Sequence, residues 1–506
     1  MSLAMAYTRA NIGIDAPLVT VETHLSNGLP GFSIVGLPEA VVRESKERVR
    51  SAILNSVLEF PAKRITVNLA PADLPKSGGR FDLAIAAGIL LASGQLPPDS
   101  IQNIELMGEL ALSGELRPVP GVLPGLIAGH GAARQSIIPK ANAAEAALLE
   151  GGNIRLCQHL IELCQYLHGQ KELPAAGKMP VVTPLHSGSL DDVVGQEQAQ
   201  RALIIAAAGG HNLLLCGPPG TGKTMLASRL GTLLPELGDQ EALEVAAVQS
   251  IAGSDFVAGS WFEVPFRAPH HTASAVALVG GGRDLRPGEI TLAHNGVLFL
   301  DELPEFSQRV LDVLREPMES GSIEISRAAY RARLPARFQL IAAMNPCPCG
   351  YYGDPFSECR CSPDRIKQYQ QRVSGPLLDR IDLQVELGRL GSADRDALLV
   401  QKTAASGTGR SSLIRKQVRV CRQRQLDRAG KTNAHLQQQE ILRDCSLCKT
   451  DKTLLNRAVE QLKLSTRAYF RILKVARTIA DFSGEAQIQS QHLLEAIGYR
   501  KFDRQL

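Results

Sequence analysis

The sequence contains no long hydrophobic run. Its longest candidate, residues 83–92, falls well short of the roughly 18 apolar residues that a membrane-spanning helix needs. The N-terminal residues mix charged side chains such as Arg9 and Asp15 with apolar ones, whereas a secretory signal peptide has an apolar segment there. We therefore expect a soluble, cytoplasmic chain without a membrane partner.

The sequence also lacks internal repeats of solenoid period, which excludes a repeat architecture. Its 506 residues exceed one compact core and suggest about three units. In the cytoplasm its 10 cysteines should be reduced, so clustered cysteines favour metal binding over disulfides.

Positive charge is concentrated in the last part of the chain. Residues 401–506 hold 21 lysines and arginines against 9 acidic residues, a net charge of +12, although the whole chain carries only +4. The first 400 residues must therefore carry −8. A basic C-terminal region is compatible with a polyanionic partner, and equally with a solvated helical surface.

Changes of pattern divide the chain into four segments. The first is predicted to be a mixed α/β domain that opens with a hairpin of strands 18–25 and 32–35. Prolines without periodicity then predict a linker, and strand and helix alternation predicts a doubly wound α/β nucleotide-binding core. The predicted bounds are 1–170 for the first domain, 171–188 for the linker, 189–390 for the core and 391–506 for a basic helical domain.

A complete phosphate-binding loop follows the apolar residues 213–216, which are predicted to form a buried strand. Glycines in such a loop let backbone N–H groups wrap phosphates. Lys223 can reach the β and γ oxygens, and Thr224 offers a hydroxyl to Mg²⁺. The sequence therefore predicts binding of a nucleoside triphosphate such as ATP. The loop comprises Gly217, Pro218, Pro219, Gly220, Thr221, Gly222, Lys223 and Thr224.

Two further apolar strands end in polar residues. Residues 297–300 are followed by Asp301, which suits a water-mediated Mg²⁺ contact, and by Glu302, which suits a general base for the attacking water. Residues 340–344 are followed by Asn345, which can orient that water beside the γ-phosphate. The alternative for Asn345 is a simple cap before a proline.

Four cysteines occur within 15 residues directly after Asn345. Four thiolates at this spacing can enclose a tetrahedral Zn²⁺ without an open position, so the role would be structural. A redox pair and unliganded thiols are the alternatives. We expect a zinc-type insertion at 346–362, with the ligands Cys347, Cys349, Cys359 and Cys361.

The order of these motifs resembles that of AAA+ ATPases, in the branch that holds magnesium chelatase subunits and the MCM helicases. Further short motifs occur at residues 269–272 (PHHT), 280–282 (GGG), 287–290 (PGEI), 323–327 (IEISR), 345–346 (NP) and 377–380 (LLDR). With these motifs the chain more closely resembles the ComM/YifB family of bacterial magnesium-chelatase-like proteins, over nearly its whole length.

The resemblance implies an AAA+ core with a helical lid. It implies that Arg380 is an arginine finger inserted into the neighbouring subunit's site, and that Arg467 is a second γ-phosphate sensor from the lid. A finger that works in trans requires a homo-oligomer, and the family implies a hexamer. The alternative for Arg380 is a salt bridge with Asp379 or Asp382.

The first domain resembles the proteolytic domain of Lon, a ribosomal-S5-like α/β fold, at residues 75–79, 114–121 and 138–142. That peptidase needs a serine and a lysine to generate its nucleophile. Here the serine position carries Arg80 and the lysine position carries Leu123. We therefore expect no peptidase activity.

Residues 321–338 are predicted to form a β-hairpin with basic and aromatic residues at its tip. Such a tip suits phosphate contact and base stacking, and in the helicases of this branch a similar hairpin lines the central channel. The alternative is an ordinary surface hairpin. The candidate DNA contacts are Arg327, Arg331 and Arg333 on the hairpin, and Arg283 and Arg286 on a second loop.

We therefore expect an ATP-driven DNA motor, a helicase or translocase acting on single-stranded or branched DNA. As the resemblance implies, it would promote branch migration during natural transformation. The alternatives are a magnesium-chelatase-like or chaperone-like ATPase that remodels a protein partner, and a scaffold that uses ATP only to assemble.

Overall fold

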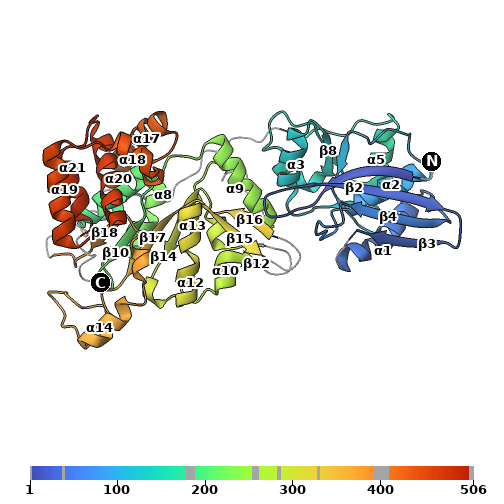
Figure 1. Ribbon diagram of the computed structural model, residues 1–506. Helices are drawn as coiled ribbons and strands as arrows, with labels where there is room; N and C mark the ends of the chain where they lie inside the picture. Colours follow the sequence, from blue (N-terminus) through green and yellow to red (C-terminus); the bar gives the residue numbers. More distant parts are fainter. Residues whose placement is uncertain are drawn as a thin grey trace.

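The structure is a computed structural model that describes residues 3–36, 40–177, 188–253, 261–281, 286–326, 331–391 and 409–500. Figure 1 shows three parts in a row: an N-terminal α/β domain, a second α/β unit and a group of C-terminal helices. The expected fold class, an α/β core with a helical lid behind an α/β domain, is confirmed. Across the described ranges, no helix is both long and apolar enough to cross a membrane.

The N-terminal domain is built on a seven-stranded mixed sheet, in the order β3-β4-β2-β1-β5-β8-β9. Its strands are β1 (Leu3–Arg9), β2 (Leu18–Ser26), β3 (Gly31–Val35), β4 (Arg64–Ala70), β5 (Ile104–Leu106), β8 (Gln135–Pro139) and β9 (Ile154–Cys157), beside a small ribbon of β6 (Glu109–Leu110) and β7 (Leu116–Arg117). Its helices are α1 (Ala40–Asn55), α2 (Asp82–Ala92), α3 (Val122–Gly131), α4 (Ala143–Ala146) and α5 (Leu160–Leu167). Helix α2 is almost entirely buried because β1, β2 and α1 all pack around it.

The predicted opening hairpin is wrong. Strands β2 and β3 do not pair, because β4 lies between them, antiparallel to β2 and parallel to β3. The other edge of β2 pairs with β1. Turn-forming residues between two strands predict only that the chain changes direction. Which strands become neighbours depends here on burial of the alternating apolar residues of β4.

The second unit contains a five-stranded sheet in the order β11-β14-β17-β10-β18, in which every neighbouring pair is parallel. Nearly all residues of its three central strands are buried, as expected for a parallel sheet covered on both faces. The strands are β11 (Phe266–Arg267), β14 (Gly296–Leu300), β17 (Phe338–Met344), β10 (Leu213–Cys216) and β18 (Leu383–Glu386).

Helices surround this sheet, and two small ribbons extend from it. The ribbons are β12 (Gly280–Gly281) with β13 (Arg286–Pro287), and the predicted hairpin of β15 (Ser322–Ser326) with β16 (Arg331–Pro335). The helices are α6 (Glu197–Gly209), α7 (Lys223–Ser228), α8 (Leu230–Leu233), α9 (Asp239–Ala252), α10 (Ala275–Val279), α11 (Glu289–Leu292), α12 (Gln308–Val313), α13 (Arg315–Ser320), α14 (Pro363–Gln370) and α15 (Gly375–Leu378).

The C-terminal helices share one hydrophobic cluster with the core. Ile472 and Ile479 of the lid belong to the same buried cluster as Ile205 of α6 and Leu213 of β10. The lid is therefore packed on the core rather than tethered to it. Its helices are α17 (Gly409–Ala429), α18 (Gln438–Asp444), α19 (Lys449–Leu462), α20 (Thr466–Ser483) and α21 (Ser490–Gly498).

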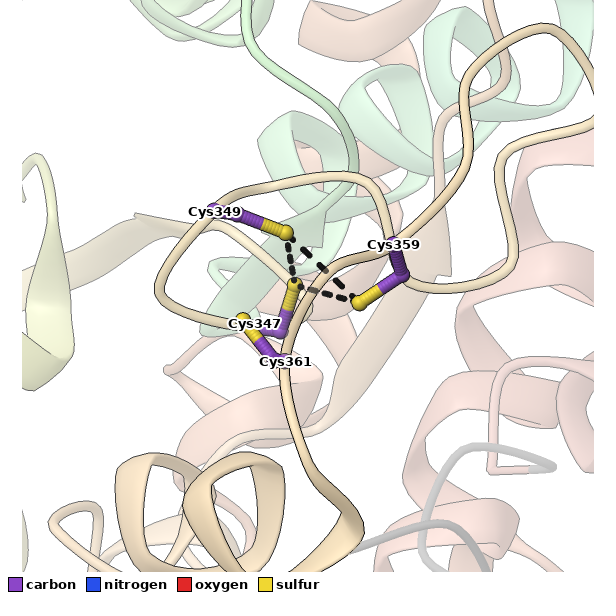
Figure 2. A group of neighbouring side chains, drawn as sticks. All are labelled: Cys347, Cys349, Cys359 and Cys361. Atoms are coloured by element: carbon purple, nitrogen blue, oxygen red, sulfur yellow. Dashed lines mark hydrogen bonds between the residues drawn. The ribbon is translucent and has the colours of Figure 1, made fainter.

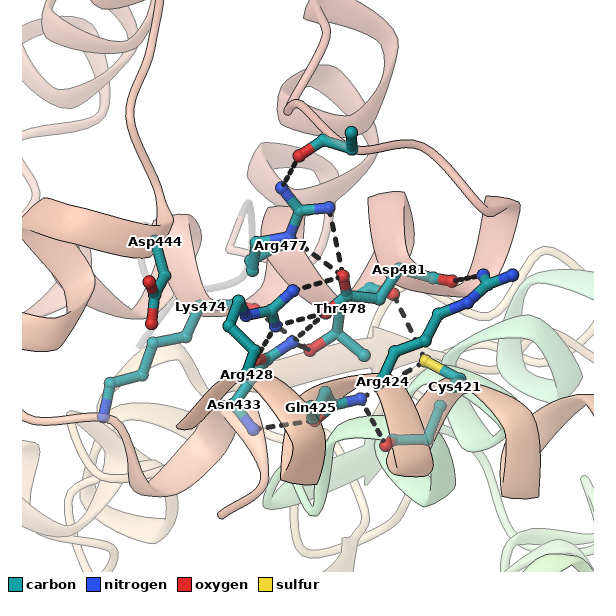
Figure 3. Close-up of polar contacts among 12 residues, drawn as sticks. Cys421, Arg424, Gln425, Arg428, Asn433, Asp444, Lys474, Arg477, Thr478 and Asp481 are labelled. Carbon is teal, nitrogen blue, oxygen red and sulfur yellow. Dashed lines mark hydrogen bonds and ion pairs between the residues drawn. The ribbon is translucent and has the colours of Figure 1, made fainter. Parts of the chain in front are cut away.

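Inside the lid, the buried carboxylate of Asp481 holds several elements together (Figure 3). It accepts hydrogen bonds from Arg428 of α17 at 2.7 and 2.6 Å, from Asn433 at 2.8 Å and from Arg477 at 3.2 Å. Its backbone carbonyl also accepts a bond from Arg424 at 2.7 Å. A single negative charge thus compensates two guanidinium groups, that of the buried Arg477 and that of the half-buried Arg428.

We expect Asp481→Asn to destabilise the lid strongly, because it removes the buried charge that both Arg428 and Arg477 contact directly. The expected loss is about 3 kcal/mol in the free energy of unfolding of this region, measured by urea denaturation. Asp427→Asn is the matched control, since Asp427 is an exposed acid of α17. Equal transition midpoints for the two variants would contradict this account of the lid.

The N-terminal domain contacts the core through α9. The backbone N–H of Gly121 donates to the carbonyl of Ser250 at 2.9 Å, and Leu123 packs with Ala246 of α9 in a small apolar cluster. Arg80 is buried nearby, and it donates to the carbonyls of Pro120 and Gly121 at 2.6 and 2.9 Å. The residues at the expected serine and lysine positions therefore serve packing and backbone contacts.

Candidate nucleotide-binding site

Three neighbouring parallel strands deliver polar residues to one edge of the core sheet. The phosphate-binding loop follows β10, Asp301 and Glu302 follow β14, and Asn345 follows β17, which lies between the other two. Because the carboxyl ends of parallel strands meet at the same edge, these groups converge although more than 120 residues separate Lys223 from Asn345.

The ammonium group of Lys223 lies at the centre of this edge. It donates to the carbonyls of Gly217 and Pro218 at 2.7 and 2.8 Å and to Oδ1 of Asn345 at 3.1 Å. Burial lowers the pKa of Lys223, and the nearby Asp301 and Glu302 oppose that shift. A partly desolvated cation among carbonyl groups is a strong partner for phosphate oxygens.

The loop backbone depends on glycine at two positions. Gly220 and Gly222 have φ of +77° and +85°, the left-handed region that L side chains adopt only with strain. Gly222 is also the residue from which α7 begins. These glycines turn the chain so that α7 starts at Lys223, next to the converging acids.

Thr224 and Asp301 form a hydroxyl–carboxylate pair. Oγ1 of Thr224 donates to Oδ2 of Asp301 at 2.6 Å, and the backbone N–H of Glu302 donates to Oδ1 of Asp301 at 2.9 Å. Hydroxyl and carboxylate oxygens are the hard ligands that Mg²⁺ prefers. The donor set therefore fits the Mg²⁺ ion that accompanies a nucleoside triphosphate.

Glu302 is held by a residue whose position the sequence analysis did not predict. Nδ1 of His271 lies 2.9 Å from Oε2 of Glu302, and Glu302 itself has a left-handed backbone with φ of +53°. The ring of His270 lies beside that of His271, with centroids 4.2 Å apart. His271 follows β11, which is the parallel neighbour of β14, the strand that precedes Glu302. The contact between the two residues could therefore have been predicted from the order of the strands, but not from the histidine pair itself.

The four cysteines of the insertion form one cluster (Figure 2). The Sγ atoms of Cys347, Cys349 and Cys359 lie 3.3 to 3.7 Å apart, and all four Sγ atoms lie within 4.8 Å of one another. Four thiolates at about 2.3 Å from one zinc ion would have sulfurs about 3.8 Å apart. The cluster is therefore compatible with zinc.

This cluster lies against the phosphate-binding loop. Gly350, with φ of +86°, packs so closely on Pro219 that a β-carbon at Gly350 would lie 2.6 Å from Cδ of Pro219. In the middle of the insertion, Asp354 pairs with Arg389 at 3.3 Å. The insertion is thus held by contacts at Gly350 and at Asp354, and Gly350 packs directly on the phosphate-binding loop.

Arg380 and Arg467 lie away from this edge. Arg380 precedes β18, which runs parallel to β10 with Leu213 opposite Leu383, so it lies at the opposite edge of the sheet from Lys223. Arg467 is exposed in the first turn of α20, four residues before Arg471, whose guanidinium contacts the backbone of Arg380.

The guanidinium of Arg380 forms an ion pair, but with neither acid expected from the sequence. Its Nη2 lies 2.5 Å from Oε1 of Glu319, and its Nη1 donates to the carbonyl of Pro376 at 2.6 Å. Asp382 is bound instead by Arg471 and by the backbone of Asn212. The salt bridge with Asp379 or Asp382 is therefore not observed.

The candidate DNA contacts are only partly described. Arg331 and Arg333 are exposed on β16, where Arg333 donates to Ser322 at 3.0 Å, and Arg286 is exposed on β13. Arg327 and Arg283 lie outside the described residues. The hairpin packs on the N-terminal domain, with Gly13 close to the carbonyl of Arg333.

A phosphate-binding loop, an acidic pair on a neighbouring strand and a polar residue on the strand between them define a P-loop ATPase core of the AAA+ class. Family models agree with this class. "Subunit ChlI of Mg-chelatase" matches residues 21–142, "Magnesium chelatase, subunit ChlI" matches 189–395, and "Magnesium chelatase, subunit ChlI C-terminal" matches 408–500. The family implies ATP and Mg²⁺ as cofactors.

Several relatives match over the full length. The chain is 53% identical to competence protein ComM of Haemophilus influenzae, covering 100% of this chain and 99% of the relative. It is 51% identical to YifB of Salmonella typhimurium and 49% identical to YifB of Escherichia coli, covering 100% of this chain and 98% of each relative. The chain therefore belongs to the ComM/YifB family of magnesium-chelatase-like proteins.

We expect His271→Ala to lower the rate of ATP hydrolysis by about tenfold while nucleotide affinity changes little, because His271 orients the carboxylate of Glu302 but does not contact the loop. Steady-state ATPase assays and binding of a fluorescent ATP analogue separate the two effects. His130→Ala is the control, since His130 is an exposed histidine of α3, outside the site. Unchanged hydrolysis in His271→Ala would show that Glu302 needs no such support.

Proposed function

We propose that this protein is an ATP-driven DNA motor that works as a homo-oligomeric, hexameric ring and promotes branch migration when incoming DNA recombines during natural transformation. The observation that carries the proposal is the full-length identity of 53% with a protein named for competence. A second support is a likeness of 24% over 222 residues to DNA replication licensing factor Mcm6 of Drosophila melanogaster.

Hydrolysis follows from the site. Lys223 and the loop backbone hold the triphosphate, and Thr224 and Asp301 would hold Mg²⁺, which neutralises phosphate charge. Glu302 accepts a proton from the attacking water, and Asn345, which already contacts Lys223, orients that water toward the γ-phosphate.

The position of Arg380 supports a ring. Arg380 lies at the sheet edge opposite to its own phosphate-binding loop, and the exposed Arg467 lies about one helical turn from Arg471, which contacts the backbone of Arg380, so both arginines are offered to a neighbouring subunit. Glu319, the present partner of Arg380, is 54% exposed although Arg380 itself is only 11% exposed, so the pair is open to solvent on the side of Glu319. A neighbour's γ-phosphate can therefore replace it and receive the charge that stabilises the transition state.

The hairpin and the second loop supply the contact with DNA. Exposed arginines on β16 and β13 suit a phosphodiester backbone, and Arg327 and Arg283 would extend both groups. Because both ribbons belong to the ATPase core, ATP-driven motion of the core would move them along the strand.

A second candidate function is remodelling of a protein partner. It is favoured by the family models and by 28% identity over 176 residues to the magnesium-chelatase 38 kDa subunit of Cereibacter sphaeroides. The response of the ATPase activity to DNA distinguishes the two functions. A protein remodeller has an ATPase activity that DNA does not change.

We expect DNA to stimulate the ATPase of the wild-type protein and the protein to migrate a labelled branched junction. Lys223→Ala should lose both activities. The double variant Arg327→Ala and Arg331→Ala should keep basal ATPase but lose DNA stimulation by about tenfold, because phosphate contacts are removed. Arg309→Ala, an exposed arginine of α12, is the matched control. No stimulation of the wild type would overturn the motor, and full stimulation of the double variant would overturn the channel assignment.

We also infer that the cysteine cluster binds one structural zinc ion, from the convergence of four thiol groups and their contact with the loop. Metal analysis should find about one zinc per chain, and Cys359→Ser should lose it and weaken ATP binding through Pro219. Cys448→Ser is the control, because Cys448 is an exposed cysteine outside the cluster. A purified wild-type chain without zinc would remove this inference.

A further inference from the structure

We propose that Arg471 is a positioning residue for the arginine finger: it fixes the base of Arg380 so that the guanidinium can serve the neighbouring subunit's site. The inference rests on the proposed function, in which Arg380 acts in trans. It concerns a residue of the lid that belongs to none of the motifs described above.

Arg471 joins the lid directly to the finger segment. Its Nη1 donates to the backbone carbonyl of Arg380 at 3.1 Å and to Oδ1 of Asp382 at 2.5 Å. The guanidinium is 22% exposed and the carboxylate only 3%. The Arg471 guanidinium thus contacts the first and the last residue of the segment 380–382.

The Asp382 carboxylate keeps its charge despite burial. Burial opposes ionisation, but the charge of Arg471 and the neighbouring His211, whose Nδ1 lies 3.5 Å from Oδ2, outweigh it and hold the pKa of Asp382 well below its usual range. A charged, buried pair leaves uncompensated charge when it is broken, which is costly. Arg471 and Asp382 should therefore move as one unit.

Other groups outside the segment complete the attachment. Asn212 donates through Nδ2 to the carbonyl of Arg380 at 3.0 Å and through its backbone N–H to Asp382 at 3.0 Å. Arg500 donates to the carbonyl of Ile381. The backbone at Arg380 therefore cannot shift independently of the lid and the start of β10.

The two ends of Arg380 are held differently. Its backbone is fixed by Arg471 and Asn212, whereas its guanidinium, itself 11% exposed, is held by the carbonyl of Pro376 and by Glu319, which is 54% exposed. Arg467 lies four residues before Arg471, on the same face of α20. With its backbone fixed, Arg380 can exchange the contact of its guanidinium with Glu319 for a contact with a phosphate. The same attachment to α20 brings Arg467 to that phosphate together with Arg380.

Mixed rings test this proposal. Subunits with Lys223→Ala cannot hold ATP but supply a finger, and subunits with Arg380→Ala hold ATP but supply none. Each alone should lack activity, and a mixture should recover ATPase activity. Arg471→Met is then added either to the finger-supplying subunit or to the ATP-holding subunit, so that any folding defect is the same in both mixtures.

We expect Arg471→Met to lower the recovered ATPase activity by about tenfold in the finger-supplying subunit and little in the ATP-holding subunit. Arg471→Lys, which keeps a charge for Asp382, should restore part of the activity. Arg457→Met, at an exposed arginine of α19, is the matched control in the finger-supplying subunit.

The outcomes distinguish a failure of the Arg471 positioning role from a failure of the trans finger. Recovery that Arg471→Met lowers equally in both positions, or in neither, overturns the positioning role of Arg471 and leaves the trans finger intact. No recovery in the parent mixture overturns the trans finger itself, and the inference falls with it.

Discussion

Parallel pairing of β10 with β17, and of β17 with β14, is the constraint on which this molecule depends. It brings residues from three distant parts of the chain to one sheet edge, where the ammonium of Lys223 meets Asn345 at 3.1 Å. The same pairing requires both faces of the sheet to be covered, which the lid achieves on one side by sharing the core's hydrophobic cluster. The candidate nucleotide-binding edge and the packing of the lid are therefore consequences of one sheet.

A parallel sheet also separates the residues at the amino ends of its strands from those at the carboxyl ends. Residues that precede a strand cannot reach those that follow its neighbour, so Arg380 and the phosphate-binding loop face opposite ways within one chain. A second subunit is the simplest means of joining them. The contacts of Arg471 and Asn212 show that this opposite edge is built as firmly as the candidate nucleotide-binding edge.

Local spacing predicted the phosphate-binding loop, the acids after β14 and the cysteine cluster, because each motif is contiguous in sequence. Predictions failed where distant segments compete. Strand β4 separates β2 from β3 because its buried apolar residues pair with both. In the same way, Glu319 reaches Arg380, and His271 reaches Glu302, only through the order of the strands. No local pattern encodes that order.

The N-terminal domain is coupled to the same sheet through α9. That helix contacts Gly121 at one end, and nearer its middle Glu244 accepts hydrogen bonds from His294 at 3.0 Å and Arg337 at 2.6 Å. The backbone of Arg337 donates in turn to Nδ1 of His294. Burial lowers the pKa of His294, and Glu244 opposes that shift. These residues precede β14 and β17, whose carboxyl ends carry Asp301, Glu302 and Asn345, so continuous contacts join the N-terminal domain to the strands of the candidate site.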